Sequence, residues 1–156
     1  MQRRQFIQTA SLALAAASLG SFNAFAKTQP TVEVWKTATC GCCHDWVAHL
    51  QASGFNVVTH DVSQAAKDAK RASVGISEQL GSCHTALVDG YALEGHVPAS
   101  DVRRLLKERP QAAGLAVPGM PMGSPGMDGP AYGGRKDAYA TLLVRRDGSS
   151  SVFQAH

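Results

Sequence analysis

The sequence has little net charge and no long apolar run. Its formal charge is only +3 over 156 residues, and two of the positive charges, Arg3 and Arg4, lie within residues 1–26. Without that segment the charge falls to +1, so the chain has little attraction for a phosphate backbone. The apolar run near the N-terminus is too short and too rich in alanine to cross a bilayer as a helix. The composition therefore gives no argument for nucleic-acid binding or for a membrane span.

Residues 1–26 have the layout of an export signal. The segment begins MQRRQF, continues as an apolar run, and ends in AFA, a small-residue cleavage pattern. The paired arginines favour the twin-arginine route, and a disordered basic leader is the alternative. We therefore expect 1–26 to be removed and 27–156 to form one periplasmic domain that has no membrane contact after cleavage.

The sequence also lacks internal repeats, so its elements are predicted from ordinary periodicity. Alternating or apolar runs predict strands over 31–37 and 55–62, and a hairpin over 84–98 that turns at Asp89-Gly90. Helical spacing predicts helices over 41–53, over 63–73, and over a segment carrying Val102, Leu105 and Leu106 that ends before Pro110. The order β-α-β-α-β-β-α indicates an α/β, thioredoxin-like fold with the cysteine motif after its first strand.

The composition of the C-terminal third changes at two points. Residues 117–134, VPGMPMGSPGMDGPAYGG, contain six glycines, four prolines and three methionines. Such a segment cannot form a helix or strand of any length. Two apolar runs, 138–146 and 149–154, then flank Asp147-Gly148 and predict a C-terminal β-hairpin.

Cysteine is scarce and unevenly placed. Of the four cysteines, Cys40, Cys42 and Cys43 lie within four positions, and Cys83 stands apart. An exported protein with four cysteines normally forms two disulfides. A Cys40–Cys43 bridge, however, closes so small a loop that it would stabilise little. A C-x-x-C pair at the start of a helix favours reactive thiols instead, because the helix dipole stabilises a thiolate.

Cys42 needs a further explanation, since a simple dithiol site has no use for a third thiol. Adjacent cysteines pair only with strain, so the one available partner is Cys83. A structural Cys42–Cys83 disulfide, worth about 3–4 kcal/mol, is one interpretation. In thioredoxin-like proteins, however, the residues before the third strand face the C-x-x-C pair and usually include a cis-proline. Cys83-His84 falls at that place without a proline, so we expect four sulfurs to converge with His84 beside them.

Four converging thiols indicate a site for a soft metal, which means Cu(I), zinc or an iron–sulfur cluster. Four-cysteine zinc sites usually come from two C-x-x-C pairs, and the usual iron–sulfur spacings are not seen here. Three methionines in the 117–134 loop favour Cu(I), although they could instead form an adaptable hydrophobic lid. The predicted ligands are Cys40, Cys42, Cys43 and Cys83, with His84, Met120, Met122 and Met127 as further candidates.

The remaining histidines differ in interest. His49, His60 and His156 stand alone in the sequence and are expected at the surface. His44 follows the cysteines directly but, within a helix, it could point away from them. His96 precedes the third helix and is either a second ligand or a polar group near the helix end. The sequence decides neither case.

Three stretches resemble the CopG-like periplasmic copper-resistance proteins, long known only as a domain of unknown function and unrelated to the plasmid repressor of the same name. They are VWKTATCGCCHDWVAHL, SCHTALVDGYALEGHVPASDVRRLL and GLAVPGMPMGSPGM, in that order, and the resemblance covers nearly all of 27–156. It implies a thioredoxin-like fold and a place beside other copper-resistance components. It also implies a site for several Cu(I) ions at Cys40, Cys42, Cys43 and Cys83.

We interpret the chain as a periplasmic Cu(I)-binding protein of copper tolerance, in which Cys40 is the exposed entry thiolate and the site can cycle the redox state of copper. The alternative is a thiol–disulfide oxidoreductase without metal, in which Cys40 attacks a partner protein, Cys43 resolves, and Cys42–Cys83 is an accessory bridge. A third interpretation is a disulfide-stabilised binding module with no reactive cysteine.

Overall fold

The computed structural model describes residues 29–156, and the predicted export signal 1–26 lies outside them. Within the described residues, no helix is long and apolar enough to cross a membrane. The helices are α1 (Gly41–Ala52), α2 (Gln64–Ser73) and α3 (Ala99–Glu108). The strands are β1 (Thr31–Lys36), β2 (Asn56–Asp61), β3 (His84–Val88), β4 (Tyr91–Glu94), β5 (Gly114–Ala116), β6 (Ala140–Val144) and β7 (Ser150–Ala155).

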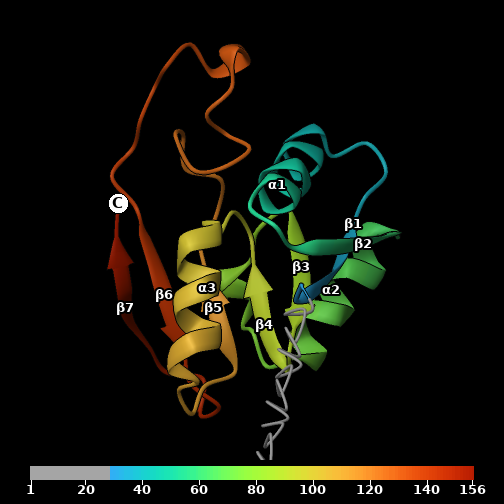
Figure 1. Ribbon diagram of the computed structural model, residues 1–156. Helices are drawn as coiled ribbons and strands as arrows, with labels where there is room; N and C mark the ends of the chain where they lie inside the picture. Colours follow the sequence, from blue (N-terminus) through green and yellow to red (C-terminus); the bar gives the residue numbers. More distant parts are fainter. Residues whose placement is uncertain (1–28) are drawn as a thin grey trace, which may run out of the picture.

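All seven strands belong to one sheet, in the order β2-β1-β3-β4-β5-β6-β7 (Figure 1). β1 runs parallel to β2 and antiparallel to β3, and β4 is antiparallel to β3 but parallel to β5. The remaining pairs, β5 with β6 and β6 with β7, are antiparallel. The mixed α/β class and the predicted order β-α-β-α-β-β-α are confirmed from β1 to α3. The thioredoxin-like assignment stays a prediction.

Local sequence signals explain where several elements end. The β3–β4 hairpin turns at Asp89 and Gly90, which have φ of 50° and 85°, as the Asp-Gly pair predicts for a two-residue turn. α2 begins after Ser63, whose hydroxyl accepts a hydrogen bond from the Ala66 N–H at 3.2 Å. The predicted C-terminal hairpin is also confirmed, with β6 and β7 on either side of Asp147-Gly148. Strand β5 and two short 3₁₀ turns, Glu78–Leu80 and Pro130–Tyr132, were not predicted.

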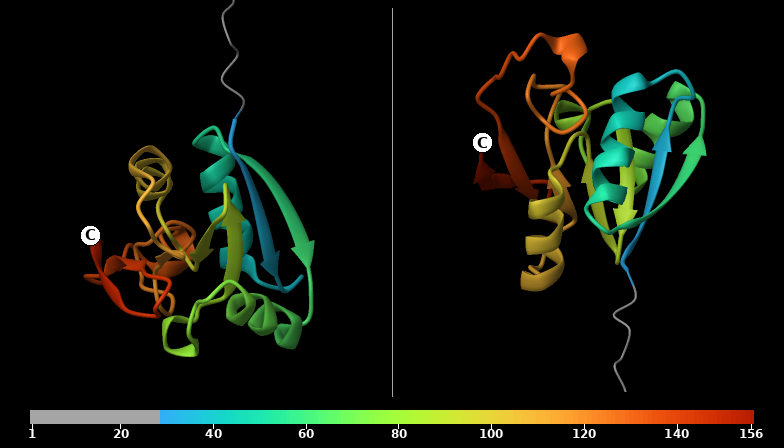
Figure 2. Two further views of the ribbon diagram at one scale, coloured as in Figure 1. Left: turned by 90° about the horizontal axis from the view of Figure 1, so that it is seen from below. Right: turned by 45° about the horizontal axis from the view of Figure 1, so that its top comes forward.

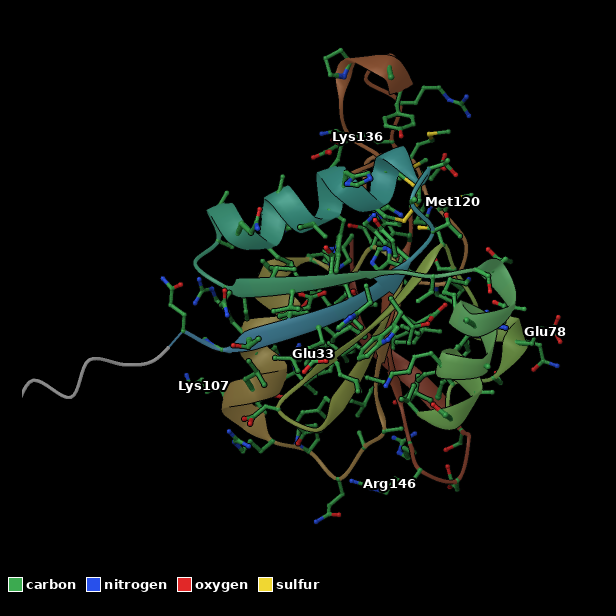
Figure 3. The ribbon with its side chains drawn as sticks, turned by 90° about the vertical axis from the view of Figure 1, so that its right-hand side faces the viewer. Glu33, Glu78, Lys107, Met120, Lys136 and Arg146 are labelled. Atoms are coloured by element: carbon green, nitrogen blue, oxygen red, sulfur yellow. A yellow bond between two sulfur atoms is a disulfide. The ribbon has the colours of Figure 1, made fainter. Side chains whose placement is uncertain are left out.

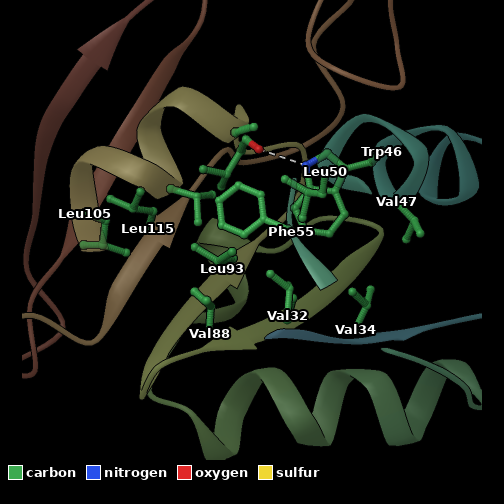
Figure 4. Close-up of a cluster of buried hydrophobic side chains, with 14 of the residues drawn as sticks. Val32, Val34, Trp46, Val47, Leu50, Phe55, Val88, Leu93, Leu105 and Leu115 are labelled. Atoms are coloured by element: carbon green, nitrogen blue, oxygen red, sulfur yellow. Dashed lines mark hydrogen bonds between the residues drawn. The ribbon is translucent and has the colours of Figure 1, made fainter. Parts of the chain in front are cut away.

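Helices cover both faces of the sheet. α1 and α3 lie on one face, and α2 lies on the other (Figures 2 and 4). Trp46 anchors the α1 face, because it is fully buried and its Nε1 donates to the Val97 carbonyl at 2.9 Å. The largest buried side chains around it come from α1, α3, four strands and the turn before β2: Val32, Val34, Leu50, Phe55, Val88, Leu93, Val102, Leu105 and Leu115. This core fixes α1, and with it the cysteines at its start, above the ends of β1 and β3.

Helix α2 was predicted to be a polar surface helix, and most of its residues are exposed or partly exposed. Lys67 is the exception, because its side chain is buried. Its Nζ donates to the Ser82 carbonyl at 2.6 Å and lies 3.1 Å from an Asp68 carboxylate oxygen. A buried ammonium requires such partners. Lys67 thereby ties α2 to the segment that precedes β3.

Candidate metal centre

Three of the cysteines occupy the start of α1. Cys40 is the N-cap residue, and Cys42 and Cys43 lie in the first turn. Cys43 is fully buried, whereas Cys40 and Cys42 are partly exposed. Figure 3 shows the sulfur atoms gathered at this end of the helix, next to the loop from β1. The unpaired N–H groups of a first helical turn favour negative charge, which suits thiolates.

Cys83 reaches the same place from a distant part of the chain. It immediately precedes β3, and its Sγ lies 3.8 Å from that of Cys42, which in turn lies 3.6 Å from that of Cys40. The four sulfurs all lie within 4.8 Å of one another. The structure therefore brings together the four cysteines that the sequence predicted to converge.

The cysteines are not all free thiols. Cys40 and Cys43 are joined by a disulfide, while Cys42 and Cys83 are free. The Cys42–Cys83 bridge that the sequence left open is therefore not formed. Burial, together with the neighbouring Cys42, raises the pKa of Cys83 to about 12. Cys83 is thus a neutral thiol at neutral pH, and a metal ion that binds it must displace a proton.

A buried polar frame holds the backbone next to Cys83. The Ser82 N–H donates to Glu94 Oε1 at 2.7 Å, and its carbonyl accepts from Lys67 Nζ. The Ser82 hydroxyl donates to the Gly119 carbonyl at the start of the glycine-rich loop. Glu94 is also buried and accepts a second hydrogen bond, from the Thr85 hydroxyl at 2.7 Å. Sequence reasoning missed this frame, because no local pattern marks Glu94 or Lys67 as a buried charged residue.

This frame makes stability depend on pH. Burial raises the pKa of Glu94, although hydrogen bonds from Thr85 and Ser82 oppose the shift. When a carboxyl has a higher pKa in the folded state, the protein loses stability as the pH rises. The loss begins near the unfolded-state pKa of that carboxyl, about 4.3, and is complete above its raised folded-state pKa. Glu94→Gln keeps the hydrogen-bonding shape and does not titrate. We expect its unfolding free energy, relative to wild type, to increase between pH 4 and pH 8 in urea titrations; a constant difference would contradict this assignment.

Two buried histidines line the other side of Cys83. Cys83 Sγ lies 3.4 Å from His84 Nδ1 and 3.0 Å from His96 Nε2. Burial, together with His96, holds the pKa of His84 well below its usual value. Burial also lowers the pKa of His96, although the hydrogen bond with the Pro125 carbonyl opposes this. Both rings are therefore neutral at neutral pH, and each has a lone pair that a metal could use.

The glycine-rich loop lies directly against the cysteine helix. Residues 124–127 are buried. A Cβ on Gly126 would lie 2.6 Å from the Cys42 carbonyl oxygen and 2.8 Å from the backbone nitrogen of Trp46. Only glycine allows this approach, since Gly126 also has a φ of 86°. The sequence predicted only irregular structure for this loop, and the structure shows residues 124–127 packed between α1 and His96.

The three methionines of this loop have different environments. Met127 is only 6% exposed and directly follows Gly126, whereas Met120 is 52% exposed. Met120 lines an open cavity of about 530 Å³ together with Tyr139, and Met122 lines a neighbouring one of about 410 Å³. Of the three methionines, Met127 is therefore the one next in sequence to Gly126, which contacts α1.

The other histidines are placed as follows. His44 is exposed and contacts Lys36 Nζ and the Ala38 carbonyl, each at 3.3 Å, so it points away from the sulfurs. His156 is exposed, as expected, and His49 is partly exposed, but each has a specific hydrogen-bonding partner. His49 Nε2 accepts from the Ala99 N–H at 3.1 Å and so caps α3. His156 Nε2 lies 2.9 Å from the buried Asp101 carboxylate. His60 is partly exposed and stacks on the Trp35 ring.

Comparisons with known proteins agree with this geometry. Residues 80–127 match a family model described as a protein of unknown function, DUF411. Two solved structures are similar over 82% of this chain and 98% of their own, each with a TM-score of 0.74. They are described as copper resistance protein copG, forms 2 and 1, and are 44% and 43% identical to this chain. No curated protein matches the chain.

Proposed function

The chain belongs to the family of the copper resistance protein copG, and on that basis we propose that it binds copper as Cu(I) at Cys40, Cys42, Cys43 and Cys83. The four sulfurs within 4.8 Å of one another are the observation that carries this proposal. Thiolates prefer soft ions such as Cu(I), and thiolates this close together can bridge several ions. The donors are therefore suited to a small copper cluster.

The Cys40–Cys43 disulfide links this function to redox chemistry. The same two sulfurs cannot form the disulfide and bind copper as thiolates. Loading all four cysteines therefore requires a two-electron reduction that breaks the S–S bond and leaves two thiolates. Copper capacity then depends on a thiol or other two-electron donor in the surroundings. We infer that the protein alternates between a disulfide form and a copper-loaded form.

Further parts of the proposal concern export and neighbours. Residues 1–26 serve as a signal of the twin-arginine type, which delivers a folded domain, 27–156, to the periplasm. His84 is an additional copper ligand, and Met127 is the loop methionine best placed to assist, since it is buried beside Gly126. Met120 and Met122 would serve capture of copper nearer the surface. Partners are copper ions and other copper-resistance proteins of the same compartment.

Counting copper in the reduced protein tests the proposal. Residues 27–156 are reduced, handled without oxygen and titrated with Cu(I) against a competing chelator. We expect more than one Cu(I) per chain in the wild type. Cys42→Ser removes the sulfur between Cys40 and Cys83, so bound copper should fall by at least half while the Cys40–Cys43 dithiol still forms its disulfide. An unchanged copper stoichiometry in this variant would disprove the four-cysteine copper site.

A second candidate function is thiol–disulfide exchange with a partner protein, and the Cys40–Cys43 disulfide at the start of α1 favours it. In that case Cys40, partly exposed at the N-cap, attacks the partner, and the buried Cys43 resolves the mixed disulfide. The same variant separates the two functions. An exchanger retains its full activity toward a disulfide substrate in Cys42→Ser, and it binds no Cu(I) against the chelator.

A further inference from the structure

The junction between α1 and α3 contains a hydrogen bond whose acceptor can titrate. Pro98 is the N-cap residue of α3, and no side-chain cap hydrogen bond is formed by it. His49 supplies an acceptor from the last turn of α1, because its Nε2 accepts from the Ala99 N–H at 3.1 Å. A ring nitrogen from another helix thus takes the place that a serine or aspartate oxygen usually fills at a helix start.

The Ala99 N–H determines the proton state of His49. An amide N–H can only donate, so Nε2 must carry a lone pair, and the proton of the neutral ring is on Nδ1. A protonated ring carries hydrogens on both nitrogens. Two donors would then face each other at the start of α3, where the helix dipole also disfavours positive charge. The hydrogen bond between Ala99 and His49 therefore requires a neutral imidazole.

The surroundings of His49 favour the neutral ring. The imidazole is half-buried, and burial lowers its pKa, although the Asp128 carboxylate opposes the shift. Further charged side chains on the two helices are Asp45, one turn before His49, and Asp101 and Arg103 in the first half of α3. The neutral ring therefore stabilises the fold above about pH 6.5, the usual pKa of a histidine. This contribution is lost as the pH falls through the lowered folded-state pKa.

The same junction holds the segment that leads from the metal centre to α3. Trp46, one turn before His49, donates from Nε1 to the Val97 carbonyl at 2.9 Å (Figure 4). The segment is therefore tied to α1 by two side-chain hydrogen bonds. It follows directly after His96, whose Nε2 lies 3.0 Å from Cys83 Sγ. Of the two ties, the one to His49 is the one that a proton can break near neutral pH, because an indole N–H does not titrate there.

We propose that His49 is a positioning residue that makes the metal centre respond to acidity. The neutral ring holds the segment before α3 against α1, and uptake of one solvent proton at Nε2 releases it. Arg103 still donates to the Ser53 carbonyl, so the opening is confined to the start of α3. The inference rests on the proposed copper function and deepens it by naming a regulator. Copper should leave the opened protein faster than protonation of the thiolates alone allows.

Hydrogen exchange at the Ala99 amide tests the switch in the copper-free protein. Its protection factor, measured by NMR between pH 7.5 and pH 4.5, should fall about fivefold in the wild type, as is typical for a lost helix cap. The ring protons of His49 should titrate with the same midpoint. His49→Gln offers an amide oxygen in place of Nε2 and does not titrate, so the protection factor should stay constant. His60→Gln, at a partly exposed histidine of β2, is the matched control and should follow the wild type.

Copper transfer tests the consequence of the opening. The reduced proteins are loaded with Cu(I), and the rate of transfer to a competing chelator is measured at the same pH values. Protonation of the thiolates is common to all variants. Acidification should therefore accelerate transfer about fivefold more in the wild type and in His60→Gln than in His49→Gln, if the cap limits release.

The two measurements fail in different ways. Different midpoints for the His49 ring and Ala99 protection, or equal protection profiles in the wild type and a folded His49→Gln, would overturn the titrating cap. Equal pH profiles of copper transfer would overturn its effect on the metal centre. If the reduced wild type bound no Cu(I) while Ala99 protection changed as expected, the proposed function would be overturned and the cap would stand.

Discussion

Cys83→Ser is expected to abolish Cu(I) binding by the reduced protein. Cys83 supplies the one sulfur of the four that comes from outside residues 40–43, and its sulfur also lies within 4.8 Å of ligand atoms of His84 and His96. Serine is nearly isosteric, and its hydroxyl can donate to His96 Nε2 in place of the thiol, so the fold should survive. A neutral hydroxyl is a poor ligand for Cu(I). We expect Cu(I) retention against a chelator to fall to background in the reduced protein.

Cys42→Ser provides the matched comparison, because Cys42 lies beside Cys40 and Cys43 at the start of α1 and not with His84 and His96. It should lower Cu(I) binding without abolishing it. The pair of variants therefore separates the contribution of the segment before β3 from that of the helix start. If Cys83→Ser, shown to be folded by circular dichroism, still retained Cu(I) as the wild type does, residues 40–43 would be the whole site. The contribution of the segment before β3 would then be disproved.

The meeting of the four sulfurs could be predicted because two local signals agree. A strand followed at once by C-x-C-C and a helix places Cys40, Cys42 and Cys43 at a helix start. The Asp89-Gly90 turn then fixes the register of the next hairpin and puts Cys83 at its entry. Both signals act over short stretches of sequence. The sequence favoured reactive thiols at Cys40 and Cys43 over a disulfide that only stabilises the fold, and in the structure the two cysteines are joined by a disulfide.

The nitrogen side of the site could not be derived in the same way. His96 lies two residues after β4, and only the pairing of β3 with β4 brings it opposite Cys83. The role of Pro125 in orienting that ring depends on the packing of a loop whose composition indicates only irregular structure. Glu94 and Lys67 were missed because a buried charge is recognised by its partners. Their partner, Ser82, is an unremarkable residue in sequence.

Strand β5 was missed because it is only three residues long and includes a glycine. Its importance comes from position. β5 pairs with β4 on one side and β6 on the other, so it joins the β2-β1-β3-β4 part of the sheet to the C-terminal hairpin. It also leads into the glycine-rich loop through Val117, whose N–H donates to the Glu94 carbonyl at 2.9 Å. The loop over the cysteines is therefore attached through a very short strand.

Gly114→Ala should accordingly be the most destabilising single change in the sheet. Gly114 pairs with Ala92, and a Cβ at Gly114 would lie 2.6 Å from the Ala92 carbonyl carbon, 2.7 Å from its nitrogen and closer still to its carbonyl oxygen. These are backbone atoms of the central sheet and cannot move without breaking the β4–β5 pairing. We expect a loss of more than about 4 kcal/mol in the free energy of unfolding, which is exceptional for one methyl group. Urea unfolding followed by circular dichroism measures it.

Gly129→Ala is the control for the general cost of replacing a glycine. A Cβ there meets nothing within 4 Å, and the φ of −72° suits any residue. Its effect should stay within about 0.5 kcal/mol. Since β5 holds the loop, Gly114→Ala should also expose Cys42, and a thiol reagent should label it faster than in the control at urea concentrations where both remain folded. Equal stability and equal labelling in the two variants would mean that the sheet does not depend on the close approach at Gly114.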